Sequence, residues 1–68
     1  MKYNVGTIVD LYDPGFKQWR GEYTVVKLYP ETGLYKIKGT TGSQQHVREK
    51  NLRPGRLGPF RIESLRAL

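Results

Sequence analysis

The sequence predicts a small all-β barrel of five strands with a short C-terminal extension. Short runs rich in β-branched and aromatic residues alternate with compact turns, and no helix pattern lies between them. A length of 68 residues allows one domain. We expect the barrel to take residues 1–56 and the extension to take residues 57–68.

The first two runs predict strands. Residues 5–12 form the first run, with Gly6 at its entrance and a turn sequence, Asp-Pro-Gly, at its exit. Residues 22–29 form the second, because apolar residues alternate along it. Strict alternation divides this run into one face with Thr24, Val26 and Leu28 and another with Tyr23, Val25, Lys27 and Tyr29. Lys27 indicates that its face reaches solvent.

The next segments predict two hairpins. Residues 30–33, Pro-Glu-Thr-Gly, form a tight turn. Residues 34–39 then alternate as a half-buried strand, which places Tyr35 and Ile37 inward. A second turn at residues 40–43 leads into a short fourth strand at residues 44–48, in which Val47 is the apolar anchor.

The remaining sequence leaves two alternatives open. Residues 49–52 predict one helical or 3₁₀ turn that ends at residues 53–55, and no pattern locates the fifth strand. In the extension, Ile62, Leu65 and Leu68 could line a short helix, whereas Phe60 and Ile62 could belong to a closing strand. A helix this short is marginal in isolation, so the segment must dock on the barrel, meet a partner or stay mobile.

The charge of the chain is concentrated in its second part. Residues 1–30 carry four Lys or Arg and three acids, whereas residues 31–68 carry eight Lys or Arg and three acids, which together give the net charge of +6. A basic excess of this kind is the electrostatic footprint of a polyanion partner, and nucleic acid is the leading candidate. Plain solubility is the alternative explanation.

Several classes of function are disfavoured. A chain this small has little core to hollow out for a substrate, so we expect a module that is not an enzyme and uses no cofactor. The absence of cysteine removes a disulfide framework and a thiolate zinc site, and favours an intracellular protein. His46 is the single histidine and by itself supports neither a metal site nor a general base. The apolar runs are too short for a membrane span.

Aromatic residues offer a second recognition surface. Tyr12, Phe16, Trp19 and Tyr23 cluster around the first long loop. Such rings can stack on exposed bases or enclose a methylated ammonium group, and acidic neighbours suited to the second role are present in the same segment. Half-buried packing is the alternative for Trp19 and Tyr23.

The order of these motifs resembles the SH3-like barrel that forms the C-terminal DNA-binding domain of retroelement and retroviral integrases. The resemblance covers residues 5–54 and rests on Val-Gly-Thr-Ile-Val at 5–9, Trp-Arg-Gly-Glu-Tyr at 19–23, His-Val-Arg at 46–48 and Asn-Leu-Arg-Pro at 51–54. Glu22 stands where those domains commonly have proline. Tudor-like chromatin-reader barrels share much of the same pattern. Both families imply a noncatalytic module that acts by binding.

From charge and resemblance together we expect binding of nucleic acid, mainly duplex DNA, through backbone phosphates and with little sequence preference. The residues expected to make these contacts are Trp19, Arg20, Lys36, Lys38, Arg48, Lys50, Arg53 and Arg56. Two alternatives stay open. One is a Tudor-like reader of methylated peptides that uses the aromatic cluster, and the other is an assembly module that associates through edge strands or the C-terminal tail.

Overall fold

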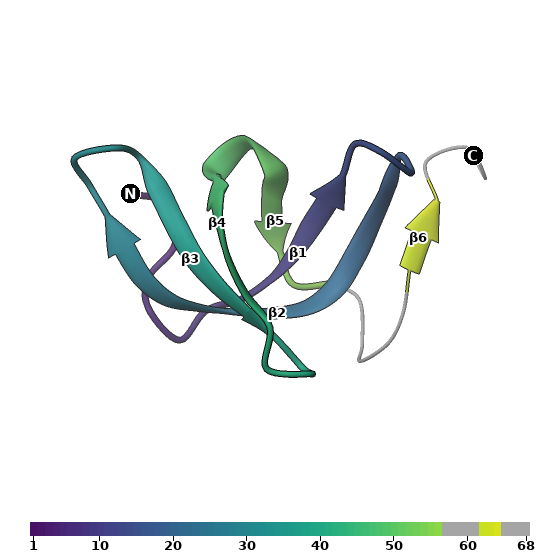
Figure 1. Cartoon of the computed structure of the whole chain (residues 1–68), viewed down its shortest axis with the longest axis horizontal. Coiled ribbons are helices and arrows are strands. Elements are labelled where there is room, and N and C mark those ends of the chain that lie inside the picture. The colour runs from purple at the N-terminus through teal and green to yellow at the C-terminus, as the bar shows by residue number, and fades with distance from the viewer. Residues whose placement is uncertain (57–61, 65–68) are drawn as a thin grey trace.

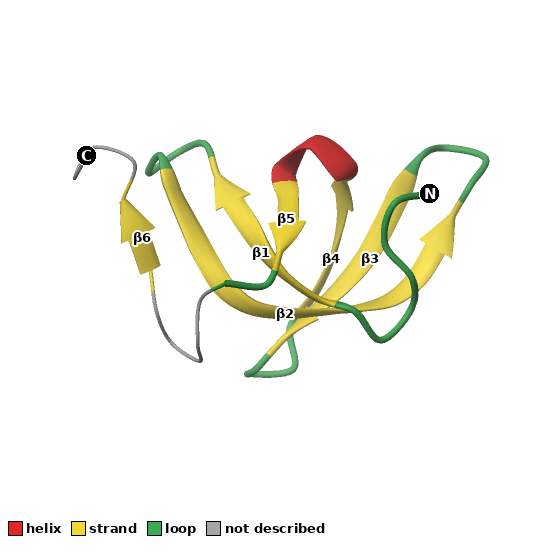
Figure 2. Cartoon of the chain, turned by 180° about the vertical axis from the view of Figure 1, so that it is seen from behind, coloured by secondary structure: helices red, strands yellow, loops and turns green. Residues whose placement is uncertain are grey.

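The structure is a computed structural model that describes residues 1–56 and 62–64. Within these residues the chain is all-β, with antiparallel strands in the order β4-β3-β2-β1-β5, and a further strand, β6, pairs with β2 (Figure 1). The predicted all-β class is therefore confirmed. The strands are β1 (Ile8–Asp13), β2 (Gln18–Tyr29), β3 (Leu34–Gly39), β4 (Gln44–Arg48), β5 (Leu52–Pro54) and β6 (Ile62–Ser64); the 3₁₀ turn η1 (Glu49–Asn51) joins β4 to β5 (Figure 2).

The first strand begins later than the sequence predicted, because a turn precedes it. Gly6 has a φ of 94°, a conformation that glycine adopts without steric cost, and the Thr7 amide donates to the Asn4 carbonyl at 3.1 Å. The Gly6 amide also donates to the Val25 carbonyl at 2.7 Å. The turn therefore stays attached to β2 although it lies outside the regular ladder.

The long strand β2 begins earlier than predicted and crosses the whole molecule (Figure 1). Its first part pairs with β1 and its second part with β3. The register shifts between Val25 and Lys27, and this bulge reverses the faces of the residues that follow. Strict alternation was therefore wrong here: Leu28 pairs with buried Tyr35 and packs on the core, whereas Lys27 and Tyr29 lie on the opposite face from Val25.

Both predicted hairpins and the two strands they introduce are confirmed. Gly33 has a φ of 74° in the first turn, and Gly42 has a φ of 92° in the second. Tyr35 and Ile37 on β3 are fully buried, and Val47 is the buried residue of β4. The predicted 3₁₀ turn after β4 is also present as η1.

The fifth strand lies where the sequence suggested only the end of a turn. In β5, Leu52 pairs with Leu11 and Pro54 pairs with Val9 of β1. Gly55 follows, at a place where a Cβ atom would lie 2.8 Å from Ile8 Cγ2 and 2.9 Å from the Ile8 carbonyl oxygen, so the close approach to β1 requires glycine.

The extension contributes a strand over Ile62–Ser64, which pairs with residues 18–20 of β2. This supports the strand alternative for these three residues. The predictions for Phe60, Leu65 and Leu68 lie outside the described residues. No helix in the described ranges is long and apolar enough to cross a membrane.

The buried core lies on the inner surface of the curved sheet. Val9, Val25, Tyr35 and Ile37 have no exposed surface. The side chains around them come from β1, β2, β4, β5 and the N-terminal segment: Tyr3, Leu11, Val47 and Leu52, with Tyr23 and Leu28 packed against the cluster. Because this surface is filled by apolar groups, the charged side chains of the same strands are left on the outer surface.

Candidate nucleic-acid interface

Basic side chains occupy the outer surface of β2, β3 and β4. Successive residues of a strand point to opposite faces. Lys36 and Lys38 therefore lie on the far side of the sheet from Tyr35 and Ile37, which are fully buried. On β4, buried Val47 in the same way places its neighbours outward.

The strand register brings these outward residues together. Lys36 on β3 lies opposite Lys27 on β2 and opposite His46 on β4. In the next row, Leu34 separates Tyr29 from Arg48. We call this surface the basic face and define it as Lys27, Tyr29, Lys36, Lys38, His46 and Arg48. Four of its members are exposed, and Tyr29 and Lys36 are half-buried.

The two rings of the basic face contact one another across β3. The ring centroids of Tyr29 and His46 are 5.2 Å apart with an angle of 65° between the planes, and His46 Nε2 lies 3.4 Å from the Tyr29 hydroxyl. The Lys27 ammonium lies 5.2 Å from the centroid of the Tyr29 ring. Cations and aromatic rings are thus mixed on one surface.

No carboxylate among the described residues forms an ion pair with a cation of the basic face. Lys27 and Lys36 lie directly opposite one another, and like charges in this position destabilise a sheet. An anion supplied from outside would remove that repulsion.

Strands β1 and β5, at the opposite end of the strand order from β4, carry cations that already have partners. Asp10 on β1 is fully buried, and its Oδ2 accepts hydrogen bonds from Arg53 Nε at 3.0 Å and from the Arg56 amide at 3.1 Å. The Arg53 guanidinium also lies 4.3 Å from the centroid of the Trp19 ring, which packs on Tyr12 at 5.3 Å. One face of the Trp19 ring is thereby covered from within the molecule.

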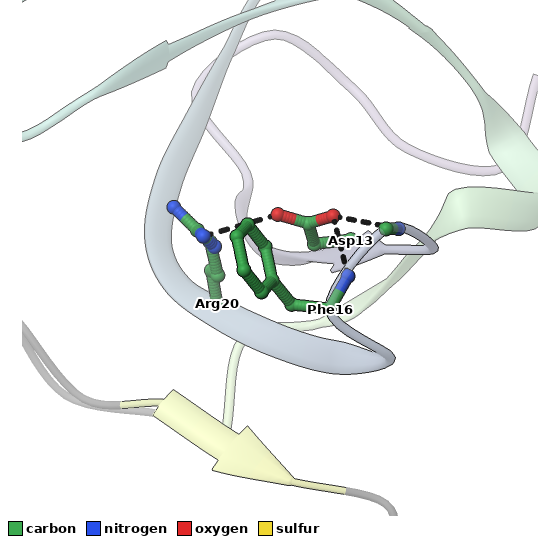
Figure 3. Close-up of polar contacts among 4 residues, drawn as sticks. Asp13, Phe16 and Arg20 are labelled. Carbon is green, nitrogen blue, oxygen red and sulfur yellow. Dashed lines mark hydrogen bonds and ion pairs between the residues drawn. The ribbon is translucent and has the colours of Figure 1, made fainter.

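A second ion pair lies at the loop between β1 and β2 (Figure 3). Arg20 Nη2 is 3.0 Å from Asp13 Oδ2, and the guanidinium is 5.7 Å from the Phe16 ring centroid. Asp13 Oδ1 accepts hydrogen bonds from the amides of Gly15 and Phe16, which fixes the turn. We call the two ion pairs and the rings beside them the paired region: Asp10, Arg53 and Trp19, with Asp13, Arg20 and Phe16.

The structure therefore divides the residues that the sequence proposed. Lys36, Lys38 and Arg48 lie together on the basic face. Trp19, Arg20 and Arg53 belong to the paired region. Lys50 is exposed in η1, and Arg56 is exposed just beyond β5, with its amide on Asp10.

The residues predicted from the sequence to contact nucleic acid did not include Lys27, Tyr29 or His46 of the basic face. A signal for two of them was present. Counting back from the turn at residues 30–33 pairs Tyr29 with Leu34 and Lys27 with Lys36, which is the register observed. Strict alternation counted from Tyr23 does not predict the bulge between Val25 and Lys27. His46 had no sequence signal, because its contact with Tyr29 crosses an intervening strand.

Only two of the four aromatic residues predicted to cluster around the first loop line a common groove. Tyr12 and Tyr23 line a groove of about 300 Å³, together with Arg20 and Asp13. Phe16 and Trp19 are not among its lining residues; the Phe16 ring lies near Arg20 and the Trp19 ring near Arg53. Arg20 and Asp13 form an ion pair at 3.0 Å within this lining, so together they add no formal net charge to the groove. Binding of a methylated ammonium group there stays a prediction.

A polar anchor lies beneath the basic face. The buried Tyr35 hydroxyl donates to Glu49 Oε1 at 2.6 Å and accepts from the Tyr3 amide at 3.2 Å, and the Lys2 amide donates to the same Glu49 oxygen at 3.1 Å. Burial raises the pKa of the Tyr35 phenol, and the bond to Glu49 raises it further. The Tyr35 hydroxyl in turn lowers the pKa of the Glu49 carboxyl. The anchor ties the N-terminal segment and η1 to β3.

Within residues 1–56 and 62–64, no group of three or more His, Asp or Glu side chains is placed to hold a metal ion. Comparison of the chain with protein-family models, with curated proteins and with solved structures finds no match. The resemblances to integrase and Tudor-like domains are therefore not supported by an identified relative.

Proposed function

We propose that this chain is a noncatalytic nucleic-acid-binding module that holds the phosphate backbone through the basic face. The observation that carries the proposal is the opposition of Lys27 and Lys36 with no carboxylate paired to either in the described residues. Such an arrangement costs folding stability and gains from a bound polyanion. Lys38 and Arg48 extend the same surface by one row on either side.

The ligand of these side chains is the sugar-phosphate backbone. Lysine and arginine bind phosphate without base-edge geometry, so phosphate contacts position a nucleic acid and carry no sequence information. Duplex DNA presents such phosphates at high density, in agreement with the expectation from the sequence. We therefore expect little sequence preference and a steep dependence of affinity on salt.

The proposed architecture is the SH3-like barrel. Strands β1 to β4 are neighbours in chain order, and β5 returns to pair with β1. This connection supports a sheet that curls on itself, as the expected barrel requires. The curvature turns the apolar surface inward and leaves the outer surface of β2, β3 and β4 as the binding face.

The proposal is tested by titrating a labelled DNA duplex over a range of salt concentrations. The double variant Lys36→Gln/Lys38→Gln should lower the slope of log affinity against log salt by about 1.8, because each lysine that pairs with a phosphate adds about 0.9 to that slope. The matched control Lys2→Gln/Lys17→Gln removes the same charge from positions outside the basic face and should leave the slope unchanged. Equal reductions in the two double variants, or an affinity that is independent of salt, would overturn the proposal.

A further inference from the structure

The rings of Tyr29 and His46 lie among the cations of the basic face. Contacts with phosphate use the cations and do not use these two rings. Tyr29 shares its row with Arg48, and His46 shares its row with Lys27 and Lys36. The two rings meet above β3 at a centroid distance of 5.2 Å. They therefore form an edge-to-face pair of rings flanked by positive charge.

A hollow of about 240 Å³ adjoins this surface at the turn between β2 and β3. Tyr29, Pro30, Lys27 and Glu31 are among its lining residues. One lysine and one glutamate give the hollow no formal net charge, so a phosphate group gains little there. A neutral, planar group next to the Tyr29 ring fits it better.

The Trp19 ring is a useful contrast. Arg53, which covers it, is held by buried Asp10, and the Arg53 side chain is only 15% exposed. Lys27, which lies near the Tyr29 ring, is exposed and has no ion pair in the described residues. A ligand can displace the Lys27 ammonium toward a phosphate, whereas it cannot displace Arg53 without breaking a buried pair.

We infer that Tyr29 and His46 form a base-stacking site, which makes single-stranded nucleic acid the preferred ligand of the basic face. This inference rests on the proposed function. In a duplex the faces of the bases are stacked on one another, whereas a single strand can turn a base onto a protein ring while its phosphates contact nearby cations. Lys36, Lys38 and Arg48 supply those cations, and the hollow beside Tyr29 accommodates the edge of the base.

The test compares labelled oligothymidylate, oligouridylate and a DNA duplex of matched length by fluorescence anisotropy at one salt concentration. Tyr29→Leu should weaken binding of the single strands by roughly 5- to 150-fold, the range for loss of one stacked base, and should change duplex binding by less than about twofold. Tyr29→Phe keeps the ring and should bind as the parent does. Tyr12→Leu removes a ring outside the basic face and should leave single-strand binding unchanged. Circular dichroism melting of each variant establishes that it is folded.

The outcomes separate this inference from the proposed function. Loss of single-strand binding in Tyr29→Leu but not in Tyr29→Phe, with both oligonucleotides, supports base stacking. Equal binding of duplex and single strand, unaffected by Tyr29→Leu, would overturn the stacking site and leave the phosphate-binding face in place. Absence of binding to all three ligands would overturn the proposed function itself.

Discussion

The basic face and the paired region contain similar residues in different electrostatic settings. In the paired region, Arg53 is bound to Asp10 and Arg20 is bound to Asp13, each at 3.0 Å. On the basic face, cations lie opposite one another, and no ion pair with a carboxylate is found in the described part of the chain. The difference teaches that the position of the acids, more than the number of cations, decides which cations are neutralised within the chain.

The two regions also differ in what holds them in place. The paired region is fixed from within by Asp10, a charged group with no exposed surface. The strand under the basic face is fixed by Tyr35 and Glu49, which join β3 to η1 and to the N-terminal segment. Substitutions of Asp10, Tyr35 and Glu49 therefore test this comparison through the free energy of unfolding, independently of any ligand.

The largest effect is expected from Asp10→Asn. The substitution removes the charge of the buried carboxylate to which Arg53 Nε donates at 3.0 Å, and the Arg53 side chain is only 15% exposed. Breaking one partner of a buried pair costs about 3 kcal/mol of unfolding free energy or more. Urea denaturation followed by Trp19 fluorescence measures the decrease.

Asp13→Asn is the matched control for this comparison. The Asp13 and Arg20 side chains are 26% and 38% exposed, so removal of their ion pair should cost at most about 1 kcal/mol. Asparagine keeps an oxygen that can accept from the Gly15 and Phe16 amides. Similar decreases for the two variants would show that the two ion pairs are not in different environments.

A smaller effect is expected from Tyr35→Phe. The variant removes a hydrogen bond to a carboxylate and leaves the Tyr3 amide without its acceptor, at a cost of about 1.5 to 3 kcal/mol. Tyr29→Phe removes a more exposed hydroxyl with one long contact to His46 and should cost less than about 0.5 kcal/mol. Equal urea midpoints for these two variants would contradict the anchoring role of Tyr35.

The smallest effect on stability is expected from Glu49→Gln, and it should depend on pH. Because the pKa of Glu49 is lowered in the folded state, chiefly by the Tyr35 hydroxyl, its contribution to stability is present above the ordinary glutamate pKa of about 4.3. That contribution is lost as the pH falls through the folded pKa. Glu49→Gln should therefore be less stable than the parent near neutral pH, and the gap should narrow in acid.

Thermal melting over a pH series measures this dependence. Tyr35→Phe should weaken it, because the variant lacks the hydroxyl that lowers the pKa of Glu49. A gap between Glu49→Gln and the parent that stays constant from neutral to acid pH would show that the carboxylate charge is not used in the anchor.

Much of the fold could be predicted because its signals are local. The turns at residues 30–33 and 40–43 contain the glycines that their backbone requires, and the strand between them alternates without interruption. The burial of Tyr35 and Ile37 follows directly from that alternation. By contrast, β5 has only three residues and no alternating pattern of its own, so pairing with β1 decides it.

The basic face was predicted only in part, because some of its members depend on how the strands pair and not on a local sequence signal. Lys36, Lys38 and Arg48 lie on strands whose faces the sequence assigned correctly. Lys27 and Tyr29 follow a bulge that reverses the faces of β2, and a bulge depends on how two strands pair. Arg20 and Arg53 were proposed from charge and from the resemblance, and neither reveals that each arginine has a carboxylate partner in another segment or turn.

The amino-acid sequence by itself determined the all-β class, the hairpin turns, the inward pair on β3 and the excess of positive charge, because these depend on residue type and on spacing along one segment. The tertiary structure decided which cations are neutralised and which share an open surface. That choice depends on distances between side chains from different strands. Asp10 meets Arg53, and Lys27 meets Lys36, only after the strands have paired.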